Sequence, residues 1–362
     1  MPPISLRSIK PIYYLLLALP VAIAGGLLGW SPLLTFVAAA LGLVPLAALI
    51  GDATEALAAD AGPRIGGLLN ATLGNAAELI ITVVAIRSGL LELVKASITG
   101  SIIGNLLLVL GASVLAGGLK NGRQHFSREH AATSATSLFL AVLALAVPSV
   151  FNFTLAGEVQ PTNVVEAISV GVAVVMIVLY GLGLFYGLRH GPVDRTGTDE
   201  DEDAEVAPRW TPRQSLIVLA VTTVAVVWLS EILVGAVEPV TRALGLSQYF
   251  IGIILIPIIG NVAEHLVALE VSLKNKMELS LEIALSSSQQ IALFVAPVLI
   301  FVGLLFGRPL TLVFNTFELV ALVSAVVISA LVASDGETNW LEGAQLLGVY
   351  LILAVAFFFV RG

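Results

Sequence analysis

Apolar stretches, each about as long as a membrane-spanning helix, occupy most of this chain. A helix crosses ~30 Å of hydrocarbon with about 20 apolar residues, and inside a bilayer only helices and closed barrels satisfy every backbone polar group. Stretches of this length lie at residues 11–30, 34–58, 65–86, 97–119, 131–151, 164–188, 213–237, 249–271, 278–306, 310–333 and 340–360. We therefore expect an all-α fold, a polytopic membrane protein with about 11 transmembrane helices.

Composition excludes several classes of protein. Charged residues make up 12% of the chain and hydrophobic residues 58%, whereas a soluble domain is about 25% charged. The sequence has no cysteine, which excludes disulfides, thiolate metal sites and haem attachment. It also lacks the basic stripe of a nucleic-acid-binding protein. The first apolar stretch is followed at once by a second, which favours a retained helix over a cleaved signal peptide.

A Gly-Asn-x-x-Glu motif occurs twice inside these apolar stretches. It reads Gly74-Asn75-Ala76-Ala77-Glu78 in the third stretch and Gly260-Asn261-Val262-Ala263-Glu264 in the eighth. Residues 66–78 and 252–264 also share a Gly and a Leu at matching positions before the motif. A carboxylate inside a membrane costs several kcal/mol and marks function by default. The repetition indicates that the chain contains two copies of one membrane module.

The distribution of basic residues predicts the orientation in the membrane. With the N-terminus in the cytoplasm, twelve of the seventeen Lys and Arg residues fall on the cytoplasmic side, as the positive-inside tendency requires. These twelve are Arg7, Lys10, Arg64, Lys120, Arg123, Arg128, Arg189, Arg195, Arg209, Arg213, Lys274 and Lys276. In this orientation the two motifs cross the bilayer in opposite directions.

This topology divides the chain into an extra first helix and two inverted repeats. Residues 1–33 hold the N-terminus and the extra helix, residues 34–188 the first five-helix repeat, and residues 213–362 the second. Transporters built in this way bind their substrate near the midplane, where the repeats meet. Residues 189–212 form an acidic cytoplasmic linker, in which residues 199–205 are either a solvated spacer or a weak collector of cations.

The repeated motifs carry the chemistry of a cation site. Glu78 and Glu264 would supply carboxylates, Asn75 and Asn261 amide oxygens, and Gly74 and Gly260 a close approach or a free backbone carbonyl. Such hard oxygen ligands suit Ca²⁺, with Mg²⁺ or Mn²⁺ as alternatives. When the ion leaves, two carboxylates in a low dielectric repel each other, so protons are expected to take its place. The competing interpretation is a buried acid that is hydrogen-bonded between helices.

Polar patches in two further helices complete the expected set of ligands. Ser101 and Asn105 lie one turn apart in the fourth stretch, and Ser286 and Gln290 do the same in the ninth. Each of these side chains serves either as a ligand or as a hydrogen-bonding contact between membrane helices. The roles of four other polar residues stay open between function and packing, namely Asp52, Glu55, Glu231 and His265.

At these motifs the sequence resembles the calcium/proton exchanger (CAX) family of the cation/calcium exchanger superfamily. The likeness spans nearly the whole chain and rests on residues 74–78, residues 260–265 and residues 286–290. It implies a Ca²⁺/H⁺ antiporter that exports Ca²⁺ from the cytosol by alternating access, with Glu78 and Glu264 binding Ca²⁺ or protons in competition. The same resemblance implies that the second and seventh helices move relative to the core.

Two other functions remain as alternatives, a Na⁺/Ca²⁺ exchanger of the same superfamily and a cation channel. An enzyme is not expected, because no nucleophile–base pair, phosphate loop or thiolate cluster accompanies the acids. We expect no prosthetic group, with Ca²⁺ as the transported ion. The expected partners are Ca²⁺, H⁺ and the lipid bilayer, with a homo-oligomer as one allowed assembly and no nucleic acid. The expected location is the cell membrane of a prokaryote.

Overall fold

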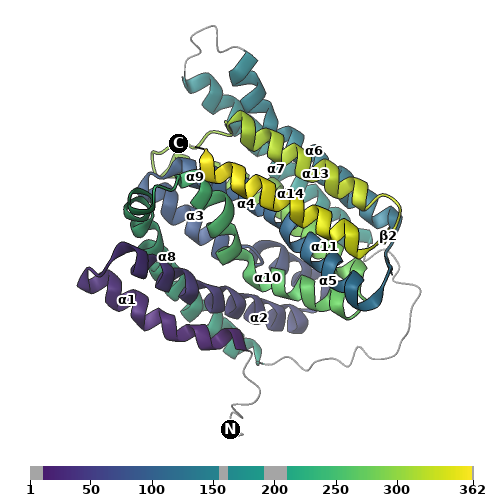
Figure 1. Cartoon of the computed structure of the whole chain (residues 1–362), viewed down its shortest axis with the longest axis horizontal. Helices are drawn as coiled ribbons and strands as arrows, with labels where there is room; N and C mark the ends of the chain where they lie inside the picture. Colours follow the sequence, from purple (N-terminus) through teal and green to yellow (C-terminus); the bar gives the residue numbers. More distant parts are fainter. Residues whose placement is uncertain (1–10, 155–161, 191–209, 361–362) are drawn as a thin grey trace, which may run out of the picture.

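The computed structural model describes residues 11–154, 162–190 and 210–360 (Figure 1). The acidic run at residues 199–205 and most of the predicted linker lie outside these ranges. The division into two repeats and a linker therefore stays a prediction.

The first part of the described chain is helical apart from one short strand. Its elements are η2 (Pro11–Leu17), α1 (Ala18–Leu28), α2 (Pro32–Leu73), α3 (Ala76–Ser88), α4 (Leu91–Ile103), η3 (Gly104–Val109), α5 (Leu110–Asn121), β1 (Gln124–His125), α6 (Arg128–Thr154) and α7 (Thr162–His190).

The second part repeats this helical character. Its elements are α8 (Pro212–Leu244), α9 (Gln248–Phe250), η4 (Ile251–Leu255), α10 (Ile256–Leu273), α11 (Met277–Gln290), η5 (Ile291–Val295), α12 (Ala296–Leu305), α13 (Thr316–Val332), β2 (Glu337–Thr338) and α14 (Trp340–Phe359). The two strands pair antiparallel, with Gln124 opposite Thr338 and His125 opposite Glu337.

The helices confirm the predicted all-α polytopic fold. In the part of the chain that the structure describes, nine helices are long and apolar enough to cross a membrane, and α13 is a shorter apolar helix. Four of the nine combine several elements, namely Pro11–Leu28, Leu91–Asn121, Gln248–Leu273 and Met277–Leu305. The end of α2 together with α3 accounts for the remaining predicted helix. The chain is an integral membrane protein.

The helix that carries the first motif is discontinuous. α2 contains a non-helical residue at Gly62, whose φ of 81° is accessible to glycine at little cost. This residue lies between the predicted stretches 34–58 and 65–86. A second interruption falls at Gly74 and Asn75, after which α3 begins at Ala76. The regular α-helix is therefore interrupted at the motif itself, just before Glu78.

Two other helices contain a π-helical turn close to their polar patches. η3 begins at Gly104, three residues after Ser101, and η5 begins at Ile291, directly after Gln290. π-turns are rare and occur frequently at functional sites. η3 follows Ser101 and includes Asn105, and η5 follows Gln290, so both irregular turns lie at residues that were expected to serve as ligands.

The start of the tenth helix was predicted too early. The apolar stretch begins at residue 310, but α13 begins at Thr316. Asn315 caps this helix, with its side chain accepting from the Glu318 backbone N–H while Glu318 accepts from the Asn315 N–H. This capping box sets the helix start more strongly than hydrophobicity does.

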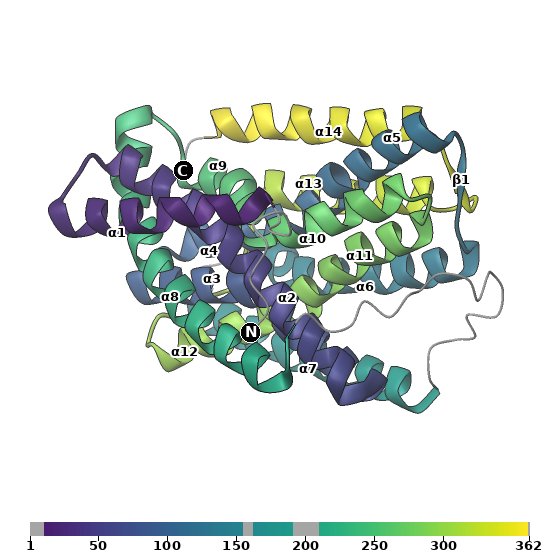
Figure 2. The ribbon, with the colours of Figure 1, turned by 90° about the horizontal axis from the view of Figure 1, so that it is seen from below.

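The helices gather around a centre formed by α3, α4, α10 and α11. Figure 1 shows α1, α2 and α8 together on one side and α6, α13 and α14 on the other, with α10 between them. Figure 2 shows α14 running along one edge, with α5 close to its end. α10 packs against α3, α4, α5 and α11, so it brings the second motif against the first.

Glycines allow the closest helix crossing in this centre. A Cβ added at Gly252 of η4 would lie 2.5 Å from the Cβ of Ala96, and one added at Gly100 of α4 would overlap the backbone of Ile253. Small residues let membrane helices approach in this way. The crossing holds η4 against α4 and so fixes the two halves of the chain relative to each other.

Candidate functional site

Glu78 lies in the first turn of α3 and is almost fully buried, with 1% of its surface exposed. Its Oε1 accepts a short hydrogen bond from the Ser101 hydroxyl of α4. Its Oε2 lies 3.4 Å from the amide nitrogen of Asn261, which also lies 3.3 Å from the Ser101 oxygen. The first carboxylate is thus held by one residue from its own half of the chain and one from the other half.

Glu264 lies in α10 and has a matching arrangement. Its Oε2 accepts a hydrogen bond of 2.6 Å from the hydroxyl of Ser287 in α11. In both halves the serine follows the glutamate by 23 residues. The residue numbers of Glu78 and Glu264 differ by the same offset as those of Ser101 and Ser287. The two acid–hydroxyl pairs are therefore repeated structural features.

The motif glycines bring the two carboxylates to one place. A Cβ added at Gly74 would lie 3.4 Å from Oε1 of Glu264, and one added at Gly260 would lie 3.4 Å from Cβ of Glu78. Each glycine thus faces the glutamate of the other motif. The sequence prediction that Gly74 and Gly260 permit a close approach agrees with this geometry.

Amide side chains extend the site on either side of the glutamates. Asn75 donates to Oε1 of Gln290 over 2.8 Å, and its own Oδ1 is buried without a hydrogen-bond partner among the described residues. Oδ1 of Asn105 lies 3.3 Å from Nε2 of His265. These contacts again join the first half of the chain to the second. Oδ1 of Asn75 is therefore a buried oxygen of the first motif that no described donor satisfies.

Neither Glu78 nor Glu264 is paired with a basic side chain in the described part of the chain. The hydroxyl and amide donors around them carry no formal charge, so an ionised pair would leave negative charge in a medium where that is costly. A bound cation or bound protons would remove the cost. The same described residues contain no cluster of three His, Cys, Asp or Glu that could hold a metal ion.

The structure brings together eight of the ten predicted ligands, places Asn105 beside His265, and directs Ser286 elsewhere. The eight are Gly74, Asn75, Glu78, Ser101, Gly260, Asn261, Glu264 and Gln290. The Ser286 hydroxyl instead contacts the Ile283 carbonyl of its own helix, at 3.4 Å. Ser287, which contacts Glu264, was missed. An alignment of the two halves on their motifs would have identified it, because Ser287 then aligns with Ser101.

Comparisons with family models, with individual proteins and with solved structures agree on the family of this chain. A family model described as sodium/calcium exchanger protein matches residues 31–188 and 214–359, which is most of the chain. The two matched ranges border the predicted linker.

Individual relatives extend this result. The chain is 45% identical to a Ca²⁺/H⁺ antiporter of Aphanothece halophytica over 357 residues, which cover 95% of each chain. It is 42% identical to the Ca²⁺/H⁺ antiporter ChaA of Bacillus subtilis, over 96% of this chain and 99% of that protein. The solved structure of native YfkE superimposes with a TM-score of 0.84 at 38% identity, over 96% of this chain and 100% of that one. The chain belongs to the Ca²⁺/H⁺ antiporter (CAX) family of the cation/calcium exchanger superfamily, a family of transporters and not of enzymes.

Proposed function

We propose that this protein is a Ca²⁺/H⁺ antiporter that exports Ca²⁺ from the cytosol in exchange for protons. The observation that carries the proposal is the pair of buried carboxylates, Glu78 and Glu264, which come from opposite halves of the chain and have no basic partner in its described part. The names of the relatives from Aphanothece halophytica and Bacillus subtilis support both ions. The bacterial relatives also support a location in the cell membrane.

Ca²⁺ binding would replace protons at the two glutamates. Ca²⁺ accepts six to eight oxygen ligands, and the carboxylates of Glu78 and Glu264 with Oδ1 of Asn75 supply part of that number. The Ser101 and Ser287 hydroxyls orient the carboxylates, since each donates to one of them. When Ca²⁺ leaves, the unpaired negative charge favours protonation. No prosthetic group takes part.

Transport further requires that the site open to one side of the membrane at a time. α2 and α8 pack extensively against each other on one side of the site. α2 also contains the non-helical residue Gly62, at which its two segments join. We infer that α2 and α8 move as a pair relative to the core and alternate access, with the N-terminus and the linker in the cytoplasm. Such motion suits two inverted repeats that meet at a midplane site.

Two alternatives make different predictions. A Na⁺/Ca²⁺ exchanger would transport Ca²⁺ only against a Na⁺ gradient, and a channel would pass Ca²⁺ without coupling to either ion. The amide of Gln290 beside Asn75 favours the proton-coupled site, because a Na⁺-coupled site would present a fuller set of Asn or Asp ligands.

The test is ⁴⁵Ca²⁺ uptake into proteoliposomes of the purified full-length protein. One set of vesicles carries a pH gradient without Na⁺, and a second carries a Na⁺ gradient at equal pH. We expect uptake in the first set and none above protein-free vesicles in the second. Uptake driven only by Na⁺ would move the protein to the exchanger alternative, and equal uptake without any gradient of H⁺ or Na⁺ would indicate a channel.

A further inference from the structure

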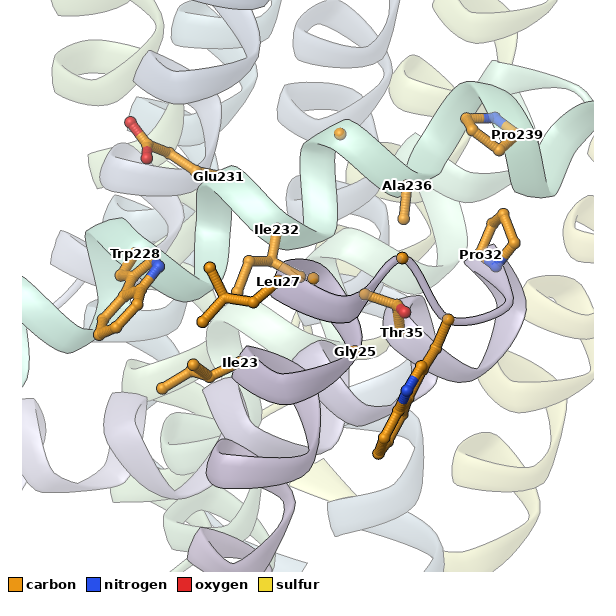
Figure 3. Close-up of a pocket in the computed structure, with 14 residues that line it drawn as sticks. Ile23, Gly25, Leu27, Pro32, Thr35, Trp228, Glu231, Ile232, Ala236 and Pro239 are labelled. Carbon is orange, nitrogen blue, oxygen red and sulfur yellow. The ribbon is translucent and has the colours of Figure 1, made fainter.

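A groove opens between α1, the turn that follows it, and α8, on the side of the molecule away from α14 (Figures 1 and 3). Its volume is about 390 Å³, which lies in the range of small-molecule sites. Most of its wall is apolar or glycine, including Ile23, Leu27, Ile232 and Gly235. It lies apart from Glu78 and Glu264, neither of which lines it.

One polar group in this groove lacks a partner. The side chain of Thr35 lines it and is 93% buried, since its exposed fraction is 7%. Its Oγ1 has no hydrogen-bond partner among the residues that the structure describes. Figure 3 shows Thr35 in the middle of the labelled side chains. This oxygen exposes almost no surface, so the groove wall at Thr35 is effectively apolar.

The rim of the groove carries the Glu231 carboxylate, which is paired with Arg87 outside the groove, together with indole rings. Glu231 stands at one edge with its carboxylate directed outward (Figure 3). It pairs with Arg87 at 3.0 Å, and both side chains are well exposed, at 46% and 68%. Trp30 and Trp228 also line the groove and are 42% and 46% exposed. Tryptophan is enriched where membrane proteins meet the headgroup region.

We propose that this groove binds a membrane phospholipid with a primary-amine headgroup, a phosphatidylethanolamine. One acyl chain lies along Ile23 and Ile232. The lipid phosphate approaches the Arg87 guanidinium, and its ammonium group approaches the Glu231 carboxylate. The adjacent positive and negative side chains match the adjacent phosphate and ammonium of this headgroup.

The charge pair also discriminates between lipid classes. A choline headgroup has no N–H, so it cannot donate a hydrogen bond to Glu231. An anionic headgroup would satisfy Arg87 but would meet the carboxylate of Glu231 unfavourably. An amine headgroup satisfies both side chains. The lipid would therefore bridge α1 to α8 and to the end of α3, through contacts that do not involve the ion site.

Tryptophan fluorescence offers a direct test. The chain has four Trp residues, and replacing Trp210 and Trp340 with Phe leaves only Trp30 and Trp228 as reporters. The full-length variant is placed in phosphatidylcholine vesicles with increasing fractions of phosphatidylethanolamine, phosphatidylcholine or phosphatidylglycerol whose acyl chains are dibrominated. Bromine quenches indoles that lie close to it, so the curves report which lipid is enriched beside Trp30 and Trp228. We expect half-maximal quenching at an about threefold lower fraction for phosphatidylethanolamine than for the other two, as one partly exposed charged contact would give.

Three variants in this background separate the parts of the site. Glu231→Gln should abolish the preference for the amine lipid, whereas Arg87→Gln should weaken quenching by all three. Gly235→Leu should fill the groove and weaken quenching by all three, because a Cβ at Gly235 meets nothing within 4 Å and the helix keeps its packing. Gly183→Leu in α7 is the matched control, since Gly183 is equally open but lies outside the groove.

Any of three results would overturn the proposal. Superimposable quenching curves for the three brominated lipids would show that the headgroup is not recognised. Unchanged quenching in Gly235→Leu would show that no acyl chain enters the groove. A preference for phosphatidylglycerol would also overturn it, because Arg87 would then act without Glu231.

Discussion

Replacing Ser287 with alanine tests the geometry of the ion site with a matched neighbour as control. The Ser287 hydroxyl donates to Glu264 over 2.6 Å, and the side chain is 4% exposed. The Ser286 hydroxyl contacts only the Ile283 carbonyl of its own helix in the described structure, at 3.4 Å. The two serines are adjacent in sequence, yet the structure gives them different roles.

The expected effect follows from the strength of these contacts. A hydrogen bond to a charged group contributes about 1.5–3 kcal/mol, and every ~1.4 kcal/mol corresponds to a tenfold change in affinity. Because Glu264 is a proposed Ca²⁺ ligand, Ser287→Ala should raise the Ca²⁺ concentration for half-maximal transport about 10- to 100-fold. The long contact of Ser286 lies at the edge of hydrogen-bond geometry, so Ser286→Ala should change this value by less than about threefold.

The assay is the Ca²⁺ dependence of uptake into proteoliposomes under a fixed pH gradient, with equal amounts of each variant in the vesicles. Ser101→Ala, the equivalent change in the first half, should have an effect of similar size to that of Ser287→Ala. A larger effect for Ser286→Ala than for Ser287→Ala would contradict the placement of the two hydroxyls.

Three further predictions concern stability and can be measured by thermal unfolding in detergent. Gly100→Ala should destabilise the protein by about 1–3 kcal/mol, because the new Cβ would overlap the Ile253 backbone, whereas Gly348→Ala meets open space and should change stability by less than about 0.5 kcal/mol; equal effects would argue against the α4–η4 crossing. Asn315→Ala should cost about 1 kcal/mol by removing the cap of α13, and no loss would argue against a helix start at Thr316. Ca²⁺ at about 100 times its dissociation constant should stabilise the wild type by about 2.7 kcal/mol and leave Glu264→Gln unchanged, and equal stabilisation of both would place Ca²⁺ elsewhere.

Hydrophobicity alone was enough to predict most of the fold. A helix in lipid must be long and apolar, so the stretches at 131–151 and 340–360 mark α6 and α14 closely. The same criterion failed where a local hydrogen bond decides the end of a helix. It placed the start of the tenth helix at residue 310, because hydrophobicity does not reflect the capping box of Asn315 and Glu318. It also did not show that the third helix is interrupted at Gly74 and Asn75.

The candidate site, like the fold, could be predicted only in part from the sequence. Buried acids in a membrane are rare, so Glu78 and Glu264 stand out from sequence alone. The choice between Ser286 and Ser287 depends on the rotation of α11 about its axis, which one-turn spacing within the helix does not determine. Comparing the two halves residue by residue determines it, because the halves use the same serine-to-glutamate spacing. The bond from Asn75 to Gln290 has no counterpart at Asn261, so repetition alone does not predict it.

Proton release on Ca²⁺ binding tests the central claim most directly. The claim is that Ca²⁺ and protons compete for Glu78 and Glu264. Purified protein in weakly buffered detergent solution is titrated with Ca²⁺ while a pH electrode follows the protons released, and the double variant Glu78→Gln/Glu264→Gln is treated in the same way. We predict release from the wild type that saturates with Ca²⁺ and none from the double variant. Equal release from both proteins, or Ca²⁺ binding to the wild type without release, would contradict the account.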